Sequence, residues 1–115
     1  MLVGDAAHTV PPTGAKGMNL AVADVVLLTE ALRALLLDRE EDLFDAFPDA
    51  ARQRIWKAQH FSWWMTNMLH PQPGAGDFDR MRQIGELRTV VESAHGRAYL
   101  AEAYTGWPLP GGLPG

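Results

Sequence analysis

The sequence predicts a mainly α-helical chain, with three to four helices after a short strand and a loop rich in glycine and proline. Apolar residues recur with helical spacing across residues 19–37, and two further stretches, 49–69 and 78–104, are also read as helical. Glycine and proline gather between these stretches, where they interrupt regular structure. With 115 residues, of which 47% are hydrophobic, the chain has the size of one domain and is too apolar for a disordered segment.

Charge and composition exclude several classes of protein. The chain holds 10 basic and 14 acidic residues, a net charge of −4, so it has no basic face to neutralise nucleic-acid phosphates. It contains no cysteine, which excludes a disulfide scaffold and a metal site with cysteine ligands. Its first five residues lack the basic and apolar regions of a signal peptide.

The longest apolar run, residues 18–37, is not expected to cross a membrane. Four polar or charged residues interrupt it: Asn19, Asp24, Glu30 and Arg33. Charged side chains inside a bilayer are costly. The run therefore predicts a buried helix, no membrane partner, and a cytoplasmic protein.

The N-terminal segment is expected to be a strand end followed by a rigid loop. Residues 1–3 are apolar and are interpreted as the last part of a strand. Proline fixes φ and removes a backbone donor, so Pro11 and Pro12 should keep the loop extended. Gly14 and Gly17 allow backbone geometry and close approach that a side chain would prevent.

The first helix should begin near residues 17–19 and end near Leu37. It is apolar nearly all round, which predicts burial on more than one side. The charged residues 38–42 are expected to form a connection that faces water. A second helix is expected over residues 49–69, with Pro48 in or just before its first turn.

The C-terminal half is expected to hold one more helical region. A loop rich in proline and glycine, residues 70–76, separates it from the second helix. The region itself covers residues 78–104, and either Ser93 or Gly96 divides it, because serine caps helices and glycine weakens them. Residues 106–115 are expected to be irregular.

Residues 4–19 form the one segment whose residue types indicate chemistry. The Asp5 carboxylate, at the end of the expected strand, can accept hydrogen bonds from a polyol or ribose. A helix that begins near Met18 and Asn19 presents unsatisfied N–H groups and a positive dipole, which suit an anion. The Pro11–Pro12 turn can hold a carbonyl oxygen beside a ligand. The alternative is that Asp5 is a capping residue and the glycines are ordinary turn residues.

This segment resembles a flavin-binding motif. Residues 4–8, Gly-Asp-Ala-Ala-His, with residues 11–21 resemble the second flavin-binding motif of the class A FAD-dependent aromatic hydroxylases. The Thr-Gly-Ala-Lys-Gly version at residues 13–17 is similar to the branch of that family that hydroxylates 4-hydroxybenzoate. Residues 54–66 and 101–108 are similar to its C-terminal part, so the resemblance covers nearly the whole chain.

The resemblance implies a role for five residues. Asp5 would bind the ribityl chain of FAD, and the backbone N–H groups of Met18 and Asn19 would face the pyrimidine edge of the isoalloxazine. The carbonyl of Pro12, with Thr13 beside it, would face the phenolic end of the substrate. The resemblance assigns no catalytic side chain to this chain.

The implied reaction is the insertion of one oxygen atom from O2 into a small phenolic acid, ortho to its hydroxyl. FAD carries this chemistry after reduction by NADPH or NADH. A homodimer like that of the family is also implied. The alternative from another class is a non-enzymatic helical module that associates with a partner or with itself.

One part of an FAD-binding fold is not found in these residues. Such a fold holds the pyrophosphate with a strand, a Gly-x-Gly-x-x-Gly turn and a helix, and the sequence has no such pattern. We therefore expect residues 1–115 to be the C-terminal portion of the enzyme and inactive alone. Within it, residues 1–37 hold the flavin motif and the following helix, 38–106 form the C-terminal helical region, and 107–115 form an irregular tail.

Other polar and aromatic residues receive simpler interpretations. His8 is expected to be a structural histidine, and Lys16 either adds positive potential near the flavin or faces solvent. Three histidines lack the spacing of metal ligands, so no metal site is expected: His60, His70 and His95. Three tryptophans are expected to pack in the core or between subunits: Trp56, Trp63 and Trp64.

Overall fold

The computed structural model describes residues 1–109. Over these residues the chain contains helices and no strand, which confirms the mainly α-helical prediction. The elements are, in order, the 3-10 turn η1 (Gly4–Ala6), α1 (Lys16–Arg33), the π-helical turn η2 (Ala34–Asp38), α2 (Asp42–Leu69), α3 (Asp77–Glu92) and α4 (Ala94–Thr105).

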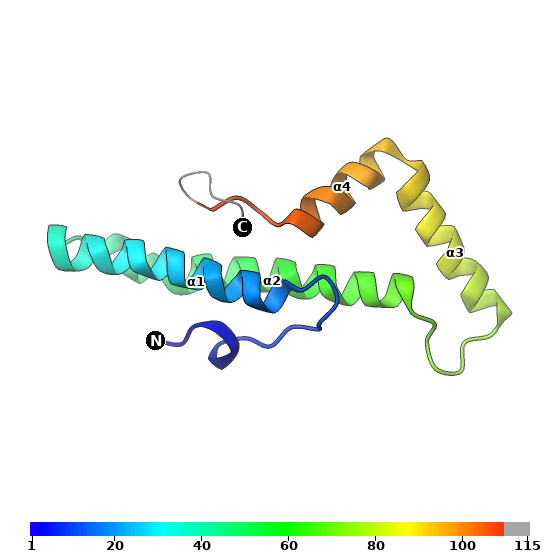
Figure 1. The fold of residues 1–115 in the computed structure, drawn as a ribbon, viewed down its shortest axis with the longest axis horizontal. Helices are drawn as coiled ribbons and strands as arrows, with labels where there is room; N and C mark the ends of the chain where they lie inside the picture. The colour runs from blue at the N-terminus through cyan, green and yellow to red at the C-terminus, as the bar shows by residue number, and fades with distance from the viewer. Residues whose placement is uncertain (110–115) are drawn as a thin grey trace.

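Helices α1 and α2 form an antiparallel pair that runs along the longest axis of the molecule (Figure 1). Small residues at the contact, among them Ala23, Ala31 and Ala58, are buried and allow the two backbones to approach closely. Phe61 of α2 has no exposed surface and fills the space below the N-terminal loop, where a Cβ at Gly14 would lie 2.9 Å from its ring. Gly14 has a φ of +83°, so both its backbone and its contact require glycine.

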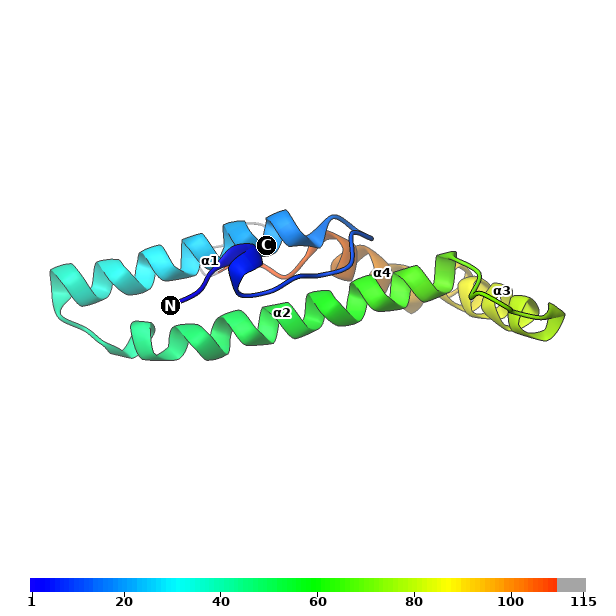
Figure 2. The same ribbon diagram turned by 90° about the horizontal axis from the view of Figure 1, so that it is seen from below.

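The N-terminal segment and α4 lie on opposite faces of the α1–α2 pair (Figures 1 and 2). Residues 1–15 cross one face, and α4 packs on the other. The Lys16 ammonium at the start of α1 donates to the carbonyl of Tyr104 at the end of α4. Arg54 of α2 donates to the carbonyls of Trp107, at 2.6 Å, and Pro108, at 3.2 Å. These two cations hold the C-terminal segment on the helical pair.

Helices α3 and α4 form an elbow at Ser93. The Ser93 hydroxyl accepts a hydrogen bond from the Gly96 amide at 3.2 Å and caps α4. The sequence analysis named Ser93 and Gly96 as possible boundaries between the two helices, and the boundary lies at Ser93. No residue of α3 is buried within the described part of the chain.

The molecule is elongated, with extents of 60 × 30 × 18 Å and a radius of gyration of 17.7 Å. A compact domain of about 100 residues has a radius of gyration near 13 Å. One face of α1 is correspondingly exposed, and its large apolar side chains follow one stripe that continues into η2: Met18, Val22, Val25 and Leu32 on α1, and Leu36 on η2. Within residues 1–109 the helix contacts both α2 and η1, whereas this stripe is left uncovered.

Two boundaries differ from the prediction. Val3 has extended dihedral angles, φ −139° and ψ 158°, but residues 1–109 offer no neighbouring strand, so the expected strand is absent there. The second helix begins at Asp42 and contains Pro48, although proline removes one helical hydrogen bond. Phe47 is 4% exposed, and burial of its ring offsets this cost.

The connection between the first two helices and the start of the C-terminal tail agree with the predictions. The connection around residues 39–41 is exposed, as expected, and residues 106–109 have no regular structure. The rest of the expected irregular tail, residues 110–115, lies outside the described residues. Among residues 1–109, no helix is both long enough and apolar enough to cross a membrane.

Candidate functional site

An open groove of about 570 Å³ lies between the N-terminal loop and the start of α1. Of the five residues predicted to bind cofactor or substrate, the groove brings together Asp5, Pro12 and Met18. Its remaining lining comes from neighbours in the same two segments: Thr9, Val10, Pro11, Gly17 and Ala21. The groove therefore coincides with the segment that the sequence indicated.

Asp5 lies in η1, with its side chain exposed at the groove. Its carboxylate takes part in no hydrogen bond or ion pair with the other described residues, since the bonds of this turn join backbone groups of Gly4, Ala7 and His8. An ionised carboxylate with both oxygens free can accept hydrogen bonds from hydroxyl groups of a ligand.

The start of α1 forms the opposite side of the groove. Ala15, the residue before the helix, has a φ of +51° and provides no side-chain cap. The first N–H groups of a helix have no partner in the helix itself and carry its positive dipole end. Gly17 and Met18 line the groove, and Met18 is 75% exposed. This end of the groove can therefore donate hydrogen bonds to a negatively charged group.

Pro12, Thr13 and Asn19 differ in their positions. Pro12 lines the groove, and its carbonyl accepts a hydrogen bond from the Ala15 amide at 3.0 Å, which fixes the direction of that carbonyl. The Thr13 hydroxyl lies 2.7 Å from that of Thr66 and attaches the loop to α2 instead of facing the groove. Asn19 lines a separate, much smaller pocket. Its predicted contact uses the backbone amide, so this role stays a prediction.

A buried pair that the sequence analysis did not assign lies behind the loop. The His8 Nε2 atom is 2.8 Å from the Asp24 Oδ2 atom, and these residues are 6% and 2% exposed. The structural interpretation of His8 is confirmed. Asp24 was noticed only as a charge that interrupts an apolar helix, and such a charge, once buried, needs a partner.

Lys16 is buried, so of its two interpretations the one in which it faces solvent is wrong, and a positive potential near the flavin stays a prediction. Its ammonium lies 5.0 Å from the centre of the Phe61 ring and 5.6 Å from that of Tyr104, in addition to its bond to the Tyr104 carbonyl. Burial lowers the pKa of Lys16 below the usual lysine value of 10.5. It places a positive charge two residues before Met18 in the chain.

The three tryptophans do not form a core cluster. Trp56 and Trp63 are 68% and 63% exposed, so core packing is the wrong interpretation for them within the described part. Packing between subunits stays a prediction. Trp64 contacts Phe61 and Tyr99, with ring centres 6.4 Å and 5.6 Å apart, and its indole N–H donates to Glu86 at 2.8 Å.

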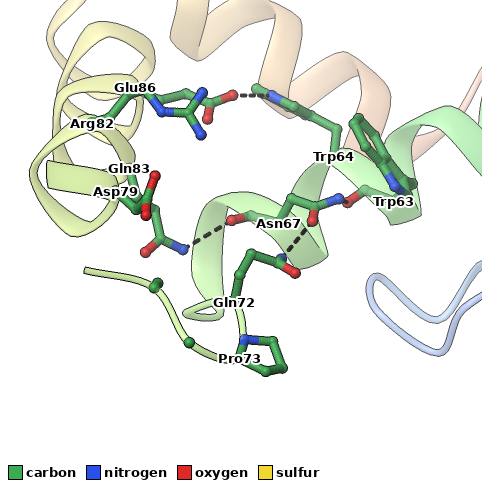
Figure 3. A pocket seen from close by; sticks show the side chains of 11 residues that line it. Trp63, Trp64, Asn67, Gln72, Pro73, Asp79, Arg82, Gln83 and Glu86 are labelled. Atoms are coloured by element: carbon green, nitrogen blue, oxygen red, sulfur yellow. Dashed lines mark hydrogen bonds between the residues drawn. The ribbon is translucent and has the colours of Figure 1, made fainter. Parts of the chain in front are cut away.

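A second cavity of about 540 Å³ lies between the end of α2, the following loop and α3 (Figure 3). Its amide side chains bind neighbouring groups: Gln72 donates to the Asn67 side chain at 2.6 Å, and Gln83 donates to the Asn67 carbonyl at 2.9 Å. None of the predicted site residues lines this cavity. The groove beside α1 therefore remains the candidate functional site.

A comparison with known families identifies the family of the chain. Residues 1–62, more than half of the chain, match the family described as FAD binding domain. The chain therefore belongs to this family, and FAD is the cofactor of the family.

Individual relatives are hydroxylases and monooxygenases by name. The chain is 45% identical to the p-hydroxybenzoate hydroxylase of Acinetobacter baylyi, over 93% of this chain and 26% of that protein. It is 33% identical to 6-hydroxy-3-succinoylpyridine 3-monooxygenase HspB of Pseudomonas putida, over 81% of this chain and 28% of that protein. The resemblance to the class A aromatic hydroxylases is confirmed. The chain spans about a quarter of the length of these relatives.

Proposed function

We propose that residues 1–37 supply the ribityl and isoalloxazine side of the FAD site of an aromatic hydroxylase. The observation that carries this proposal is the groove in which Asp5, Pro12 and Met18 meet at the start of α1. The three residues come from different turns of the chain, and the folded loop brings them to one surface.

The residues present fit a flavin. The free carboxylate of Asp5 suits the ribityl hydroxyls, which are hydrogen-bond donors. The backbone amides of Met18 and Asn19, at the N-terminus of α1, suit the pyrimidine edge of the ring, where reduced flavin carries negative charge. The buried cation of Lys16 adds to the positive potential of this helix end.

The proposed reaction of the whole protein is the conversion of 4-hydroxybenzoate to 3,4-dihydroxybenzoate, with O2 and NADPH or NADH as co-substrates. Bound FAD supplies the redox and oxygen chemistry. Residues 1–37 orient the cofactor, and the Pro12 carbonyl approaches the phenolic end of the substrate. Thr13 is next to Pro12 in the chain, but its hydroxyl pairs with that of Thr66, so its contact with the substrate is through the loop backbone. The choice of substrate is supported by the 45% identity to a p-hydroxybenzoate hydroxylase.

A second proposal concerns residues 1–115 by themselves. They contain no Gly-x-Gly-x-x-Gly pattern for the pyrophosphate, and the groove is open on the side away from the loop and α1. We therefore expect the isolated chain to bind FAD weakly and to show no NADPH oxidation that depends on 4-hydroxybenzoate. Turnover by the purified 115-residue chain would contradict this expectation.

A non-enzymatic helical module is the second candidate function. It is favoured by the exposed apolar side chains on α1 and α3, which a partner or a second copy can cover. The FAD proposal predicts in addition that the groove residues, and not only the apolar faces, affect function.

The flavin proposal is tested by transplanting this chain into its relative from Acinetobacter baylyi in place of the matching 107 residues. The hybrid should retain FAD and oxidise NADPH when 4-hydroxybenzoate is present. An Asp5→Ala substitution should weaken FAD binding about 10- to 100-fold, the usual effect of losing hydrogen bonds to a charged group. FAD affinity is measured by flavin fluorescence.

The control is Glu30→Ala, which removes an exposed carboxylate from α1 at a position outside the groove. This variant should bind FAD like the parent hybrid. If the Asp5→Ala and Glu30→Ala hybrids bind FAD equally well, the groove does not hold the ribityl chain and the proposal is wrong.

A further inference from the structure

The buried carboxylate of Asp24 joins two parts of the N-terminal turn. Its Oδ2 atom accepts a hydrogen bond from the Gly4 amide at 2.9 Å and lies 2.8 Å from the His8 ring. Asp24 comes 20 residues after Gly4 and 16 after His8, so this contact is tertiary. Residues 4 and 8 bracket Asp5 in the sequence.

The contact with Asp24 determines which ring nitrogen of His8 carries a hydrogen atom. An ionised carboxylate can only accept hydrogen bonds, so the His8 Nε2 atom carries hydrogen and donates it to Asp24. The other ring nitrogen, Nδ1, is buried and has no partner among the described residues. Both donors of the turn, the Gly4 amide and the His8 ring, therefore converge on one carboxylate oxygen.

Few other polar contacts hold this turn on the helices. No residue of η1 is buried, and the bonds from the Ala7 and His8 amides to the Gly4 carbonyl are internal to the turn. A Cβ at Gly4 would meet the Ala21 side chain at an ordinary 3.5 Å, so the turn lies close to α1 at this point. The Asp24 carboxylate is therefore the main polar connection between the turn and α1.

The buried charge of Asp24 also has a cation in its surroundings. Burial lowers the pKa of Arg54, while the negative charge of Asp24 acts in the opposite direction. Arg54 thus reduces the cost of keeping this carboxylate ionised inside the protein, and an ionised carboxylate is what the two donors of the turn require.

We propose that Asp24 and His8 are positioning residues that fix the Gly4–Ala6 turn on α1 and thereby hold the Asp5 carboxylate at the groove. The significance of Asp5 for a ribityl chain rests on the proposed function. The positioning itself concerns only contacts within this chain and is tested without flavin.

The test measures amide hydrogen exchange by NMR in the 115-residue chain. Asp24→Ala removes the acceptor, so exchange at the Gly4 amide and across residues 5–8 should accelerate about tenfold or more. Exchange in the centres of α1 and α2 should change much less. Asp24→Asn keeps one oxygen as an acceptor and should restore slow exchange at Gly4.

Variants of His8 test the other half of the pair and leave the α1–α2 contact in place. His8→Ala should accelerate exchange at residues 5–8, whereas His8→Gln, whose amide can still donate to Asp24, should restore part of the protection. Glu30→Ala, on the exposed side of α1, is the control and should change none of these rates.

Two results overturn the proposal. One is unchanged exchange at residues 4–8 in both Asp24→Ala and His8→Ala. The other is equal acceleration throughout α1 and α2, because it means that the pair stabilises the whole fold and does not position the turn. Failure of the flavin proposal is a separate result. In that case the hybrid enzyme binds no FAD, but amide exchange at residues 4–8 of the 115-residue chain still depends on Asp24.

Discussion

Lys16 belongs to the flavin motif, but its side chain is buried, and the sequence pattern alone does not predict this environment. Among residues 1–109, no carboxylate lies within ion-pair distance of its ammonium. The charge is instead stabilised by the Tyr104 carbonyl and by the faces of two aromatic rings. These contacts join the start of α1 to the end of α4.

The environment of Lys16 predicts a pH dependence of stability. Burial lowers its pKa in the folded chain, while the unfolded chain keeps the ordinary value of 10.5. Between these two values the unfolded chain binds the extra proton, so raising the pH favours the folded chain. The free energy of unfolding of the wild type, relative to that of Lys16→Met, should therefore increase from neutral pH towards 10.5.

Urea denaturation at a series of pH values measures this difference. Lys57→Met is the matched control, because Lys57 is exposed although it also lies over an aromatic ring, that of Trp107, at 4.8 Å. The difference between the wild type and Lys57→Met should stay constant over the same pH range. A constant difference for Lys16→Met would show that its ammonium is hydrated in the folded chain.

At the scale of residues, the sequence predicted the exposed part of the site better than the buried part. Asp5, Pro12 and Met18 belong to one continuous motif, so their proximity follows from a short loop. The partner of His8 is 16 residues away and can be identified only once α1 lies against the loop. The spacing of residues in the sequence does not predict which residue of a helix contacts a residue of a loop.

At the scale of elements, the elbow between α3 and α4 depends on one close contact. A Cβ added at Gly96 would lie 2.4 Å from the Val90 carbonyl oxygen, which is backbone and cannot move away easily. Gly85, in the middle of α3, has nothing within 4 Å of the same position. A side chain therefore has no room at Gly96 but has room at Gly85, although both residues lie in exposed helices.

Alanine substitutions at these two positions should have opposite effects. Gly85→Ala should stabilise the chain by about 0.5–1 kcal/mol, because alanine restricts the unfolded chain more than glycine does. Gly96→Ala should destabilise it by about 1–3 kcal/mol, the usual effect of forcing atoms into an occupied space. Denaturation followed by circular dichroism measures both, and effects of the same sign would contradict the described elbow.

The sequence predicted three to four helices and named Ser93 as one of two possible divisions, and residues 1–109 contain four α-helices. Ser93 has a local signature, a serine that can cap the next helix, and the structure uses it in that way. The start of α2 was placed too late because Pro48 is locally unfavourable inside a helix. Burial of Phe47 against the rest of the fold outweighs that local preference, and burial is not visible in a short stretch of sequence.

At the scale of the whole molecule, the most informative feature is the exposed apolar stripe of α1. Its members on α1 are Met18, Val22, Val25 and Leu32, and Leu36 continues the stripe on η2. They are spaced by three, four or seven residues, which places them on one side of a helix. The opposite side of the same helix packs against α2 through Leu20, Ala23 and Ala31. Such a stripe is typical of a surface that another structural element covers.

The stripe predicts that the isolated 115-residue chain associates in solution. Light scattering coupled to size-exclusion chromatography should give a molar mass above that of one chain. This method measures mass directly, whereas the elution volume alone would overestimate the mass of an elongated monomer. A discrete dimer would favour the helical module, whereas a broad distribution would favour a flavin-facing piece whose apolar face lacks its cover. A single monomeric peak would contradict the prediction.

Paired substitutions identify the surface responsible for this association. Val22→Glu with Val25→Lys places a charge pair of zero net charge in the stripe and should reduce the measured mass towards one chain, because burying these charges opposes association. Glu30→Lys with Arg33→Glu is the matched control, since it exchanges two exposed charges on the same helix outside the stripe. If both pairs leave the mass unchanged, the chains associate through another surface. The next residues to substitute are then the exposed apolar side chains of α3: Phe78, Met81 and Ile84.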